Sequence, residues 1–142
     1  MGGVLFVDDS ISTTPEATKA ALNAYAGKTI ALLAGGHERQ QDYGELARLL
    51  EPAGVALLIC LPVTGDRLAS AAYAAAPAVE VVEAATLTSA MEALRARSGR
   101  FDTVILSPGA PSYGQLERPG VVFRNFEERG AAFIRLAETL FG

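Results

Sequence analysis

The chain is poor in groups that could serve redox chemistry, bind a metal or cross a membrane. Its 142 residues include one cysteine, Cys60, and one histidine, His37. A single cysteine excludes an internal disulfide and fits a reducing cytosol, and no Cys/His grouping predicts a zinc site. The longest apolar stretch, 55–61, is far shorter than the ~20 residues that a membrane helix needs. We therefore expect a cytoplasmic protein with no membrane contact and no metal of its own.

Charge and motif content exclude further classes of function. Twelve Lys and Arg face 16 Asp and Glu, for a net charge of −4, and there is no basic run. Nothing therefore indicates a nucleic-acid partner. The nucleotide motifs G-x-x-x-x-G-K-[ST] and G-x-G-x-x-G are both absent. The nucleophile elbow G-x-S-x-G is also absent, so Ser112 is no candidate nucleophile and we expect no catalytic residue in this chain.

Strand-like and helix-like segments alternate along the chain, half of which is apolar. The pattern predicts βαβ units and one domain over 1–142: an α/β, Rossmann-like, open and mainly parallel sheet with helices on both faces. Capping boxes are predicted at Asp42/Glu45 and Asn125/Glu128. The expected strands are 4–7, 29–34, 55–61, 79–83 at an edge, and 103–106. The expected helices are 15–25, one after Asp42, 65–76, 87–97 and one after Asn125.

Polar residues collect where the expected strands end, which is where open α/β sheets bind ligands. Asp8 and Asp9 follow the first strand, before a helix that begins at Thr14 and Pro15. The second strand ends at a Gly-Gly turn that is followed by His37 and Arg39. Arg39 could hold a carboxylate or phosphate, although a solvated arginine is equally compatible with the spacing.

The last strand runs into the glycine- and proline-containing segment 108–124, and such long loops are usually functional or mobile. The hydroxyls of Thr13 and Ser112 suit hydrogen bonds to a small anion. Phe126 fits the periodicity of the last helix, so core packing is an alternative role for it.

Two resemblances follow from these motifs. Residues 4–10, Val-Leu-Phe-Val-Asp-Asp-Ser, are similar to the start of a response-regulator receiver domain. That family needs an aspartate after its third strand and a lysine after its fifth, and here those places read Leu61-Pro62 and Ser107-Pro108. A degenerate receiver, or another non-catalytic module that binds a small ligand, is therefore the alternative interpretation.

A broader resemblance runs from the first strand to the last helix. Residues 8–18, the Gly-Gly loop at 31–36 with Asp42-Tyr43, and residues 106–112 and 123–130 together resemble the C-terminal domain of the Mur ligases, most of all the MurD branch. The resemblance implies an ATP-dependent ligase of peptidoglycan-precursor synthesis that adds glutamate to UDP-N-acetylmuramoyl-L-alanine. It also implies that ATP and Mg²⁺ bind mainly to a central domain outside this chain.

The resemblance assigns roles to single residues. Asp9 is expected on the nucleotide side of the site. The residues expected to hold glutamate are Thr13, Arg39, Ser112, Tyr113 and Phe126. The domain is expected to close over the active site, to position glutamate, to be inactive alone and to be a monomer. Met-Gly-Gly at 1–3 is interpreted as a start joined to a domain boundary.

The chain departs from the family pattern in three places. Arg39 stands where D-glutamate ligases usually have a lysine for the side-chain carboxylate, and Ile11 replaces a lysine of some members. An arginine differs from a lysine in reach and geometry, so an enzyme that uses L-glutamate is an alternative to one that uses D-glutamate. Residues 116–122 are interpreted as an insertion and are expected to be a mobile loop.

Overall fold

The fold, described for residues 1–142 from a computed structural model, is a five-stranded parallel sheet with helices on both faces. The sheet order is β1 (Leu5–Asp8), β5 (Thr103–Leu106), β2 (Ile30–Ala34), β3 (Val55–Cys60) and β4 (Glu80–Glu83). The helices are α1 (Pro15–Ala24), α2 (Gly44–Leu49), α3 (Gly65–Ala75), α4 (Leu87–Ala96) and α5 (Phe126–Phe141). A separate hairpin joins β6 (Leu116–Arg118) to β7 (Val121–Val122). The open α/β fold predicted from the sequence is confirmed.

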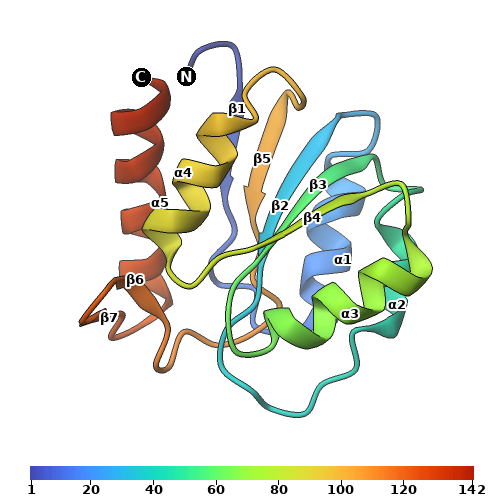
Figure 1. Cartoon of the computed structure of the whole chain (residues 1–142), viewed down its shortest axis with the longest axis horizontal. Helices are drawn as coiled ribbons and strands as arrows, with labels where there is room; N and C mark the ends of the chain where they lie inside the picture. Colours follow the sequence, from blue (N-terminus) through green and yellow to red (C-terminus); the bar gives the residue numbers. More distant parts are fainter.

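Two hydrophobic clusters hold the three layers together. Helices α1, α2 and α3 cover one face of the sheet, and α4 and α5 cover the other (Figure 1). Leu32 and Leu33 of β2 are both fully buried and belong to opposite clusters. A strand buried on both faces is a continuous apolar run, which is why 30–34 carries no polar residue.

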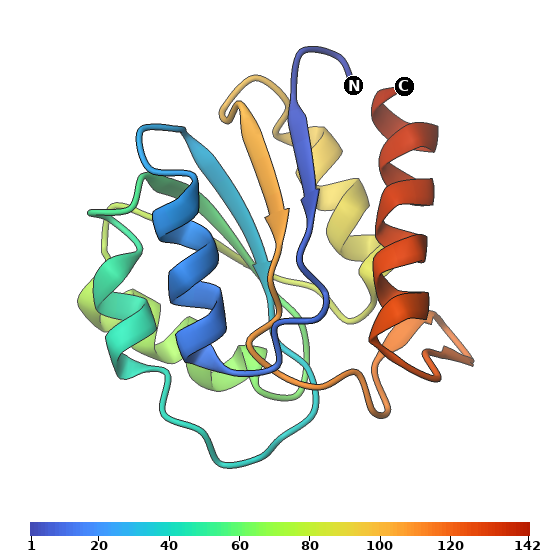
Figure 2. The same ribbon diagram turned by 180° about the vertical axis from the view of Figure 1, so that it is seen from behind.

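The position of β5 creates the place for a ligand. Strand β5 lies between β1 and β2, with Ile105 paired to Val7 on one side and to Leu32 on the other. Helices α1 and α2, which follow β1 and β2, pack on one face, whereas α5 packs on the other. The connections therefore diverge on both sides of β5, as at a topological switch point. Figure 2 shows the loops after these strands and the start of α5 together at one edge, opposite the two termini.

One predicted capping box is wrong and the other is half right. At α2 the cap is Tyr43, with no side-chain cap bond, because Asp42 Oδ1 instead accepts from the Gly44 amide at 2.8 Å. Glu45 is paired with Lys19 of α1 at 2.6 Å and is not available as the second half of a capping box. At α5 the Asn125 side chain does accept from the Glu128 amide at 2.8 Å, but the Glu128 carboxylate bonds elsewhere, as described below.

The segment 116–122, which was expected to be a mobile loop, forms a short antiparallel hairpin. Leu116 pairs with Val122, and Phe123 N donates to Gln115 O at 3.0 Å. Glu117 of the hairpin is paired with Arg135 of α5 at 3.0 Å. The hairpin therefore lies against α5, and its mobility stays a prediction.

An alanine substitution at Gly35 tests how tightly this edge of the sheet is packed. Its φ is +117°, and an added Cβ would lie 2.0 Å from the backbone oxygen of Leu61. Gly99 also has a positive φ, +95°, but a Cβ there meets nothing within 4 Å. Backbone strain should cost both alanine variants about 1–3 kcal/mol, and Gly35→Ala should lose roughly a further 1–3 kcal/mol through the clash. Urea unfolding of both variants measures this difference, and equal losses would show that the loop yields freely.

Candidate functional site

A cavity of about 150 Å³ lies at the edge where β1, β2 and β5 end. The loops after these strands and the start of α5 form its wall, which contains Thr13, Arg39, Pro111, Ser112, Tyr113, Arg124, Asn125 and Phe126. All five residues that the sequence predicted for glutamate binding line this one cavity. They come from segments up to 113 residues apart in the chain (13 and 126), and the topology of the sheet brings them together.

The chemistry of the cavity wall suits an anion. The wall contains two guanidinium groups and three hydroxyls but no carboxylate. Arg39 is exposed and takes part in none of the ion pairs of the protein. Ser112 is only 5% exposed, whereas Tyr113 is 61% exposed and stands edge-on to the His37 ring at 5.5 Å. Such a set of groups can bind and orient a ligand, and it offers no pair of nucleophile and base for covalent chemistry.

Arg67 of α3 fixes the loop that carries Arg39. Its Nε and Nη2 donate to the two carboxylate oxygens of Glu38 at 2.8 and 2.7 Å. Its Nη1 donates to the backbone oxygen of Gln41 at 2.8 Å, so one guanidinium holds both sides of Arg39. A bidentate pair of this kind fixes geometry as well as charge. The guanidinium beside it lowers the pKa of Glu38 from 4.5 to about 2.

The same loop is also tied to the loops after β1 and β5. Gln41 Nε2 donates to Thr13 O at 3.1 Å, and Tyr43 Oη donates to Gly109 O at 2.9 Å. The Tyr43 ring lies 5.0 Å beneath the Arg67 guanidinium, within the range of a cation–π contact. Burial raises the pKa of Tyr43, so its hydroxyl remains a donor at neutral pH. The three loops therefore form one connected layer.

Asp9, which was expected on the nucleotide side of the site, does not line this cavity, and its role stays a prediction. Its Oδ2 accepts from Ser12 Oγ at 2.5 Å and from Ser107 Oγ at 2.7 Å, which ties the end of β1 to the end of β5. Asp8 is the exposed acid of the pair and lines a neighbouring hollow of about 360 Å³, together with Ile11 and others. The first acid therefore faces solvent while the second holds the loops together.

Sequence reasoning missed the buried Arg129 of α5. Its side chain is fully buried, and Nε and Nη2 donate to Oγ and O of Ser10, both at 2.8 Å. Its Nη1 donates to Gln115 Oε1 at 2.8 Å, and Gln115 Nε2 donates to Gly35 O at 3.0 Å. One guanidinium thus connects α5 to the ends of β1 and β2 and to the segment after β5. The signal in the sequence was an arginine at helical spacing between the apolar Phe126 and Phe133.

Arg129 remains charged in its buried environment. The same environment explains why two neighbouring positions are glycine. Burial lowers the pKa of Arg129 to about 10, against a smaller opposing effect of Asp8, so the group is charged at neutral pH. A Cβ on Gly36 would lie 2.4 Å from Pro111 O and 3.3 Å from Arg129 Nη1. A Cβ on Gly130 would lie 2.4 Å from Asp8 Oδ2. Glycine at both positions lets the backbone approach the arginine and the acid.

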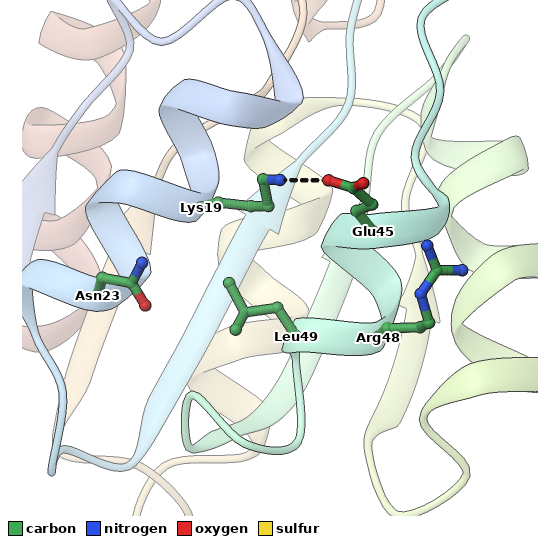
Figure 3. A pocket seen from close by; sticks show the side chains of 5 residues that line it. All are labelled: Lys19, Asn23, Glu45, Arg48 and Leu49. Atoms are coloured by element: carbon green, nitrogen blue, oxygen red, sulfur yellow. Dashed lines mark hydrogen bonds and ion pairs between the residues drawn. The ribbon is translucent and has the colours of Figure 1, made fainter.

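A second hollow, larger and more open, lies between α1 and α2 (Figure 3). It has a volume of about 490 Å³ and is crossed by the Lys19–Glu45 ion pair at 2.6 Å. Its wall is formed by Lys19, Asn23, Glu45, Arg48 and Leu49. None of the residues that the sequence assigned to a ligand lies there, so the cavity at the strand ends is the candidate site.

Comparison of the sequence with known proteins identifies the family of the chain. The family model described as "Mur ligase, glutamate ligase domain" matches residues 1–110. The chain belongs to the Mur ligase family. This membership supports the Mur ligase interpretation of the sequence over a degenerate receiver or another small-ligand module. No helix of this Mur ligase domain is long and apolar enough to cross a membrane.

Three relatives illustrate the range of the family. UDP-N-acetylmuramoylalanine–D-glutamate ligase of Rubrobacter xylanophilus is 39% identical over 96% of the chain. UDP-N-acetylmuramoyl-L-alanine–L-glutamate ligases of a Micromonospora species and of Xanthomonas oryzae are 35% and 36% identical over 92% and 95% of the chain. The alignments cover 29%, 27% and 28% of these relatives, so this Mur ligase domain spans less than a third of their length.

The role of Arg129 can be tested by Arg129→Lys. A lysine keeps the charge but cannot make three directed bonds to Ser10 and Gln115, and each lost bond to a charged group costs roughly 1.5–3 kcal/mol. We expect a loss of at least about 3 kcal/mol in the free energy of unfolding, measured with urea. Arg135→Lys on the exposed side of the same helix is the matched control and should change stability by less than about 0.5 kcal/mol. Equal stability of the two variants would contradict the role given to Arg129.

The Arg67–Glu38 pair is a clamp on the loop that carries Arg39, and it should make the stability of the folded state depend on pH. Because the folded pKa of Glu38, about 2, is below its ordinary 4.5, the clamp contributes stability above pH 4.5 that is lost as the pH falls through about 2. Carbon-detected NMR of the Glu38 carboxyl should give a pKa near 2 in the wild-type chain and a clearly higher pKa in Arg67→Met, where only hydrogen bonds from backbone amides, chiefly that of Gln40, still lower it. A Glu38 pKa that does not respond to Arg67→Met would show that the pair is not formed in solution.

Proposed function

We propose that this chain is the glutamate-binding domain of an ATP-dependent ligase that adds glutamate to UDP-N-acetylmuramoyl-L-alanine in peptidoglycan-precursor synthesis. The observation that carries the proposal is the cavity at the strand ends. It joins the five residues expected for glutamate, contains no carboxylate and presents two guanidinium groups. A glutamate substrate brings two carboxylates, and charge-assisted hydrogen bonds to arginine and hydroxyl groups are suited to receive them.

The chemistry of such a ligase explains why the domain positions rather than reacts. ATP transfers its terminal phosphoryl group to the acceptor's carboxylate, which gives an acyl phosphate and ADP. The amine of glutamate then attacks the acyl carbon, an amide bond forms, and inorganic phosphate and a proton leave. Holding the amine at the reacting carbon and excluding water lowers the barrier of that step by several kcal/mol. Fixed hydroxyls and guanidinium groups on a domain that closes over the acceptor perform this task. Closure over the active site is part of the proposal.

ATP and Mg²⁺ are assigned to the part of the ligase outside this chain. The chain carries no phosphate-loop motif, and no group of three His, Cys, Asp or Glu side chains could hold a metal ion. The chain therefore offers no three-ligand protein cage for a metal ion. A nucleotide contact by Asp9 is part of the proposal, and Oδ1 is the atom for it because the two serine hydroxyls bond to Oδ2.

D-Glutamate is our first candidate for the amino acid, and L-glutamate is the second. The printed names of the relatives support both: the Rubrobacter enzyme is named for D-glutamate and the Micromonospora and Xanthomonas enzymes for L-glutamate. Arg39 replaces the lysine expected for a D-glutamate ligase, and its planar fork accepts a carboxylate in another geometry. Steady-state ligation with each isomer decides between them.

Substitution of the two cavity hydroxyls tests the proposal. In the ligase that carries this domain, Thr13→Ala and Ser112→Ala should each raise the KM for glutamate about tenfold or more, since a hydrogen bond to a charged group contributes roughly 1.5–3 kcal/mol. Ser98→Ala, at an exposed position far from the cavity, is the control and should leave this KM unchanged. If the glutamate KM stays within twofold in both cavity variants, these hydroxyls do not bind the substrate.

A further inference from the structure

We infer that Arg124 is a second carboxylate-binding residue of the site and takes the carboxylate of glutamate that Arg39 does not bind. The inference rests on the proposed function and assigns a role to a residue that lies in the 123–130 signature but to which the family resemblance gave no role. In this assignment each of two arginines binds one carboxylate of the substrate. Arg39 receives the side-chain carboxylate and Arg124 receives the α-carboxylate.

The first observation is the placement of the two arginines. Arg39 comes from the loop after β2, and Arg124 lies just before Asn125, the N-cap of α5, yet both line the same cavity of about 150 Å³. The cavity wall contains no carboxylate, and Arg39 has no ion-pair partner, whereas Arg124 is paired with Glu128, which lies outside the wall. When glutamate attacks through its neutral amine it carries two negative charges, and two guanidinium groups match that number.

The second observation is that Glu128 orients Arg124 without using its whole fork. One Glu128 oxygen accepts from the Arg124 backbone amide at 2.9 Å, and the other is paired with Arg124 Nε. These bonds lower the pKa of Glu128, so it is a carboxylate at neutral pH. The bonds to Glu128 involve the amide and Nε, and the terminal nitrogens Nη1 and Nη2 remain for a ligand. A guanidinium can bind one carboxylate along each edge, so the ion pair positions Arg124 and does not block it.

The neighbours of Arg124 complete a carboxylate site. Asn125 and Phe126 follow it directly in the cavity wall, and Asn125 caps α5 with its side chain on the Glu128 amide at 2.8 Å. Ser112 adds a hydroxyl that is 5% exposed. The 16-residue α5 directs its amino end to this side of the cavity, and the dipole of a helix favours an anion there.

The helix also carries a matched control. Arg135 and Glu117 form a second exposed arginine–glutamate pair, at 3.0 Å, with an arginine on α5 that is not part of the cavity. Arg135→Ala removes the same kind of side chain and, like Arg124→Ala, breaks an arginine–glutamate pair that involves a residue of α5. Any effect of Arg124→Ala on substrate binding that Arg135→Ala lacks is therefore due to position and not to charge or helix stability.

The experiment compares substrate and amide analogues in the ligase that carries this domain. The probes are glutamate, glutamine with an uncharged side-chain amide, and isoglutamine with an uncharged α-amide, each as the isomer that the enzyme accepts. The KM for glutamate and the inhibition constants of both amides are measured for the wild type, Arg39→Ala, Arg124→Ala and Arg135→Ala. Thermal unfolding of each variant checks that the fold is retained.

The two cavity arginines should give complementary patterns. Arg124→Ala should weaken glutamate and glutamine about tenfold or more and leave isoglutamine unchanged, since isoglutamine lacks the carboxylate that Arg124 binds. Arg39→Ala should weaken glutamate and isoglutamine and leave glutamine unchanged. Glu128→Gln should raise the glutamate KM by less than Arg124→Ala does, and should add nothing in the Arg124→Ala background.

Three results would overturn the assignment. If Arg124→Ala matches Arg135→Ala while Thr13→Ala and Ser112→Ala still raise the glutamate KM, the cavity binds glutamate without Arg124. If both arginine variants lose their effect with the same amide, they bind one and the same carboxylate. If no cavity variant affects glutamate, the proposed function fails together with this inference.

Discussion

The buried guanidinium of Arg129 is the constraint on which the edge of this domain depends. A charge without contact to water is stable only when its hydrogen bonds are made, and an unpaired one carries a penalty of several kcal/mol. Arg129 has no carboxylate partner at hydrogen-bonding distance and relies on Ser10 and Gln115. Any rearrangement of those loops would leave a buried charge without partners. The loops after β1 and β5 therefore have one low-energy arrangement. The hydrogen bond from Gln115 to Gly35 fixes the end of β2 in the same arrangement.

A site that is held in this way needs little reorganisation when a ligand arrives. Arg67 adds a second clamp, which fixes Glu38 and Gln41 and so sets the path of the segment that carries Arg39. The binding groups project from loops that are already ordered, so ligand binding costs less conformational entropy than folding a flexible loop would. In the proposed ligase two sets of arginines have different roles: Arg129 and Arg67 fix the loops, and the arginines of the cavity contact the substrate.

The sequence predicted the sheet well because buried parallel strands are continuous apolar runs. The boundaries of β5 were predicted as 103–106 and are found there, and the edge position of β4 was also right. The capping box at Asp42/Glu45 failed because long-range partners outweighed the local motif: Lys19, 26 residues away, takes Glu45. The hairpin at 116–122 was missed because its two- and three-residue strands are too short for a periodic signal.

The candidate site shows a sharper limit of sequence reasoning. Spacing alone left Arg39 undecided between a ligand contact and a solvated side chain, and only the family resemblance joined it to Thr13 and Ser112. Helical periodicity favoured a core role for Phe126, which in the fold is half-buried at the cavity. Arg129 was quoted in a motif without a role, because its partners lie 14 and 119 residues away in the chain. Such a residue is recognised only when the fold shows what surrounds it.

The central claim is that glutamate binds at the carboxyl ends of β1, β2 and β5, in the cavity whose loops Arg129 holds. The most direct test is an experimental structure of the ligase that carries this domain, with glutamate and a nucleotide bound. The account predicts glutamate between the Thr13 and Ser112 hydroxyls, with a guanidinium on each carboxylate and the Arg129 bonds unchanged. Glutamate bound elsewhere, for example in the hollow between α1 and α2, would contradict it.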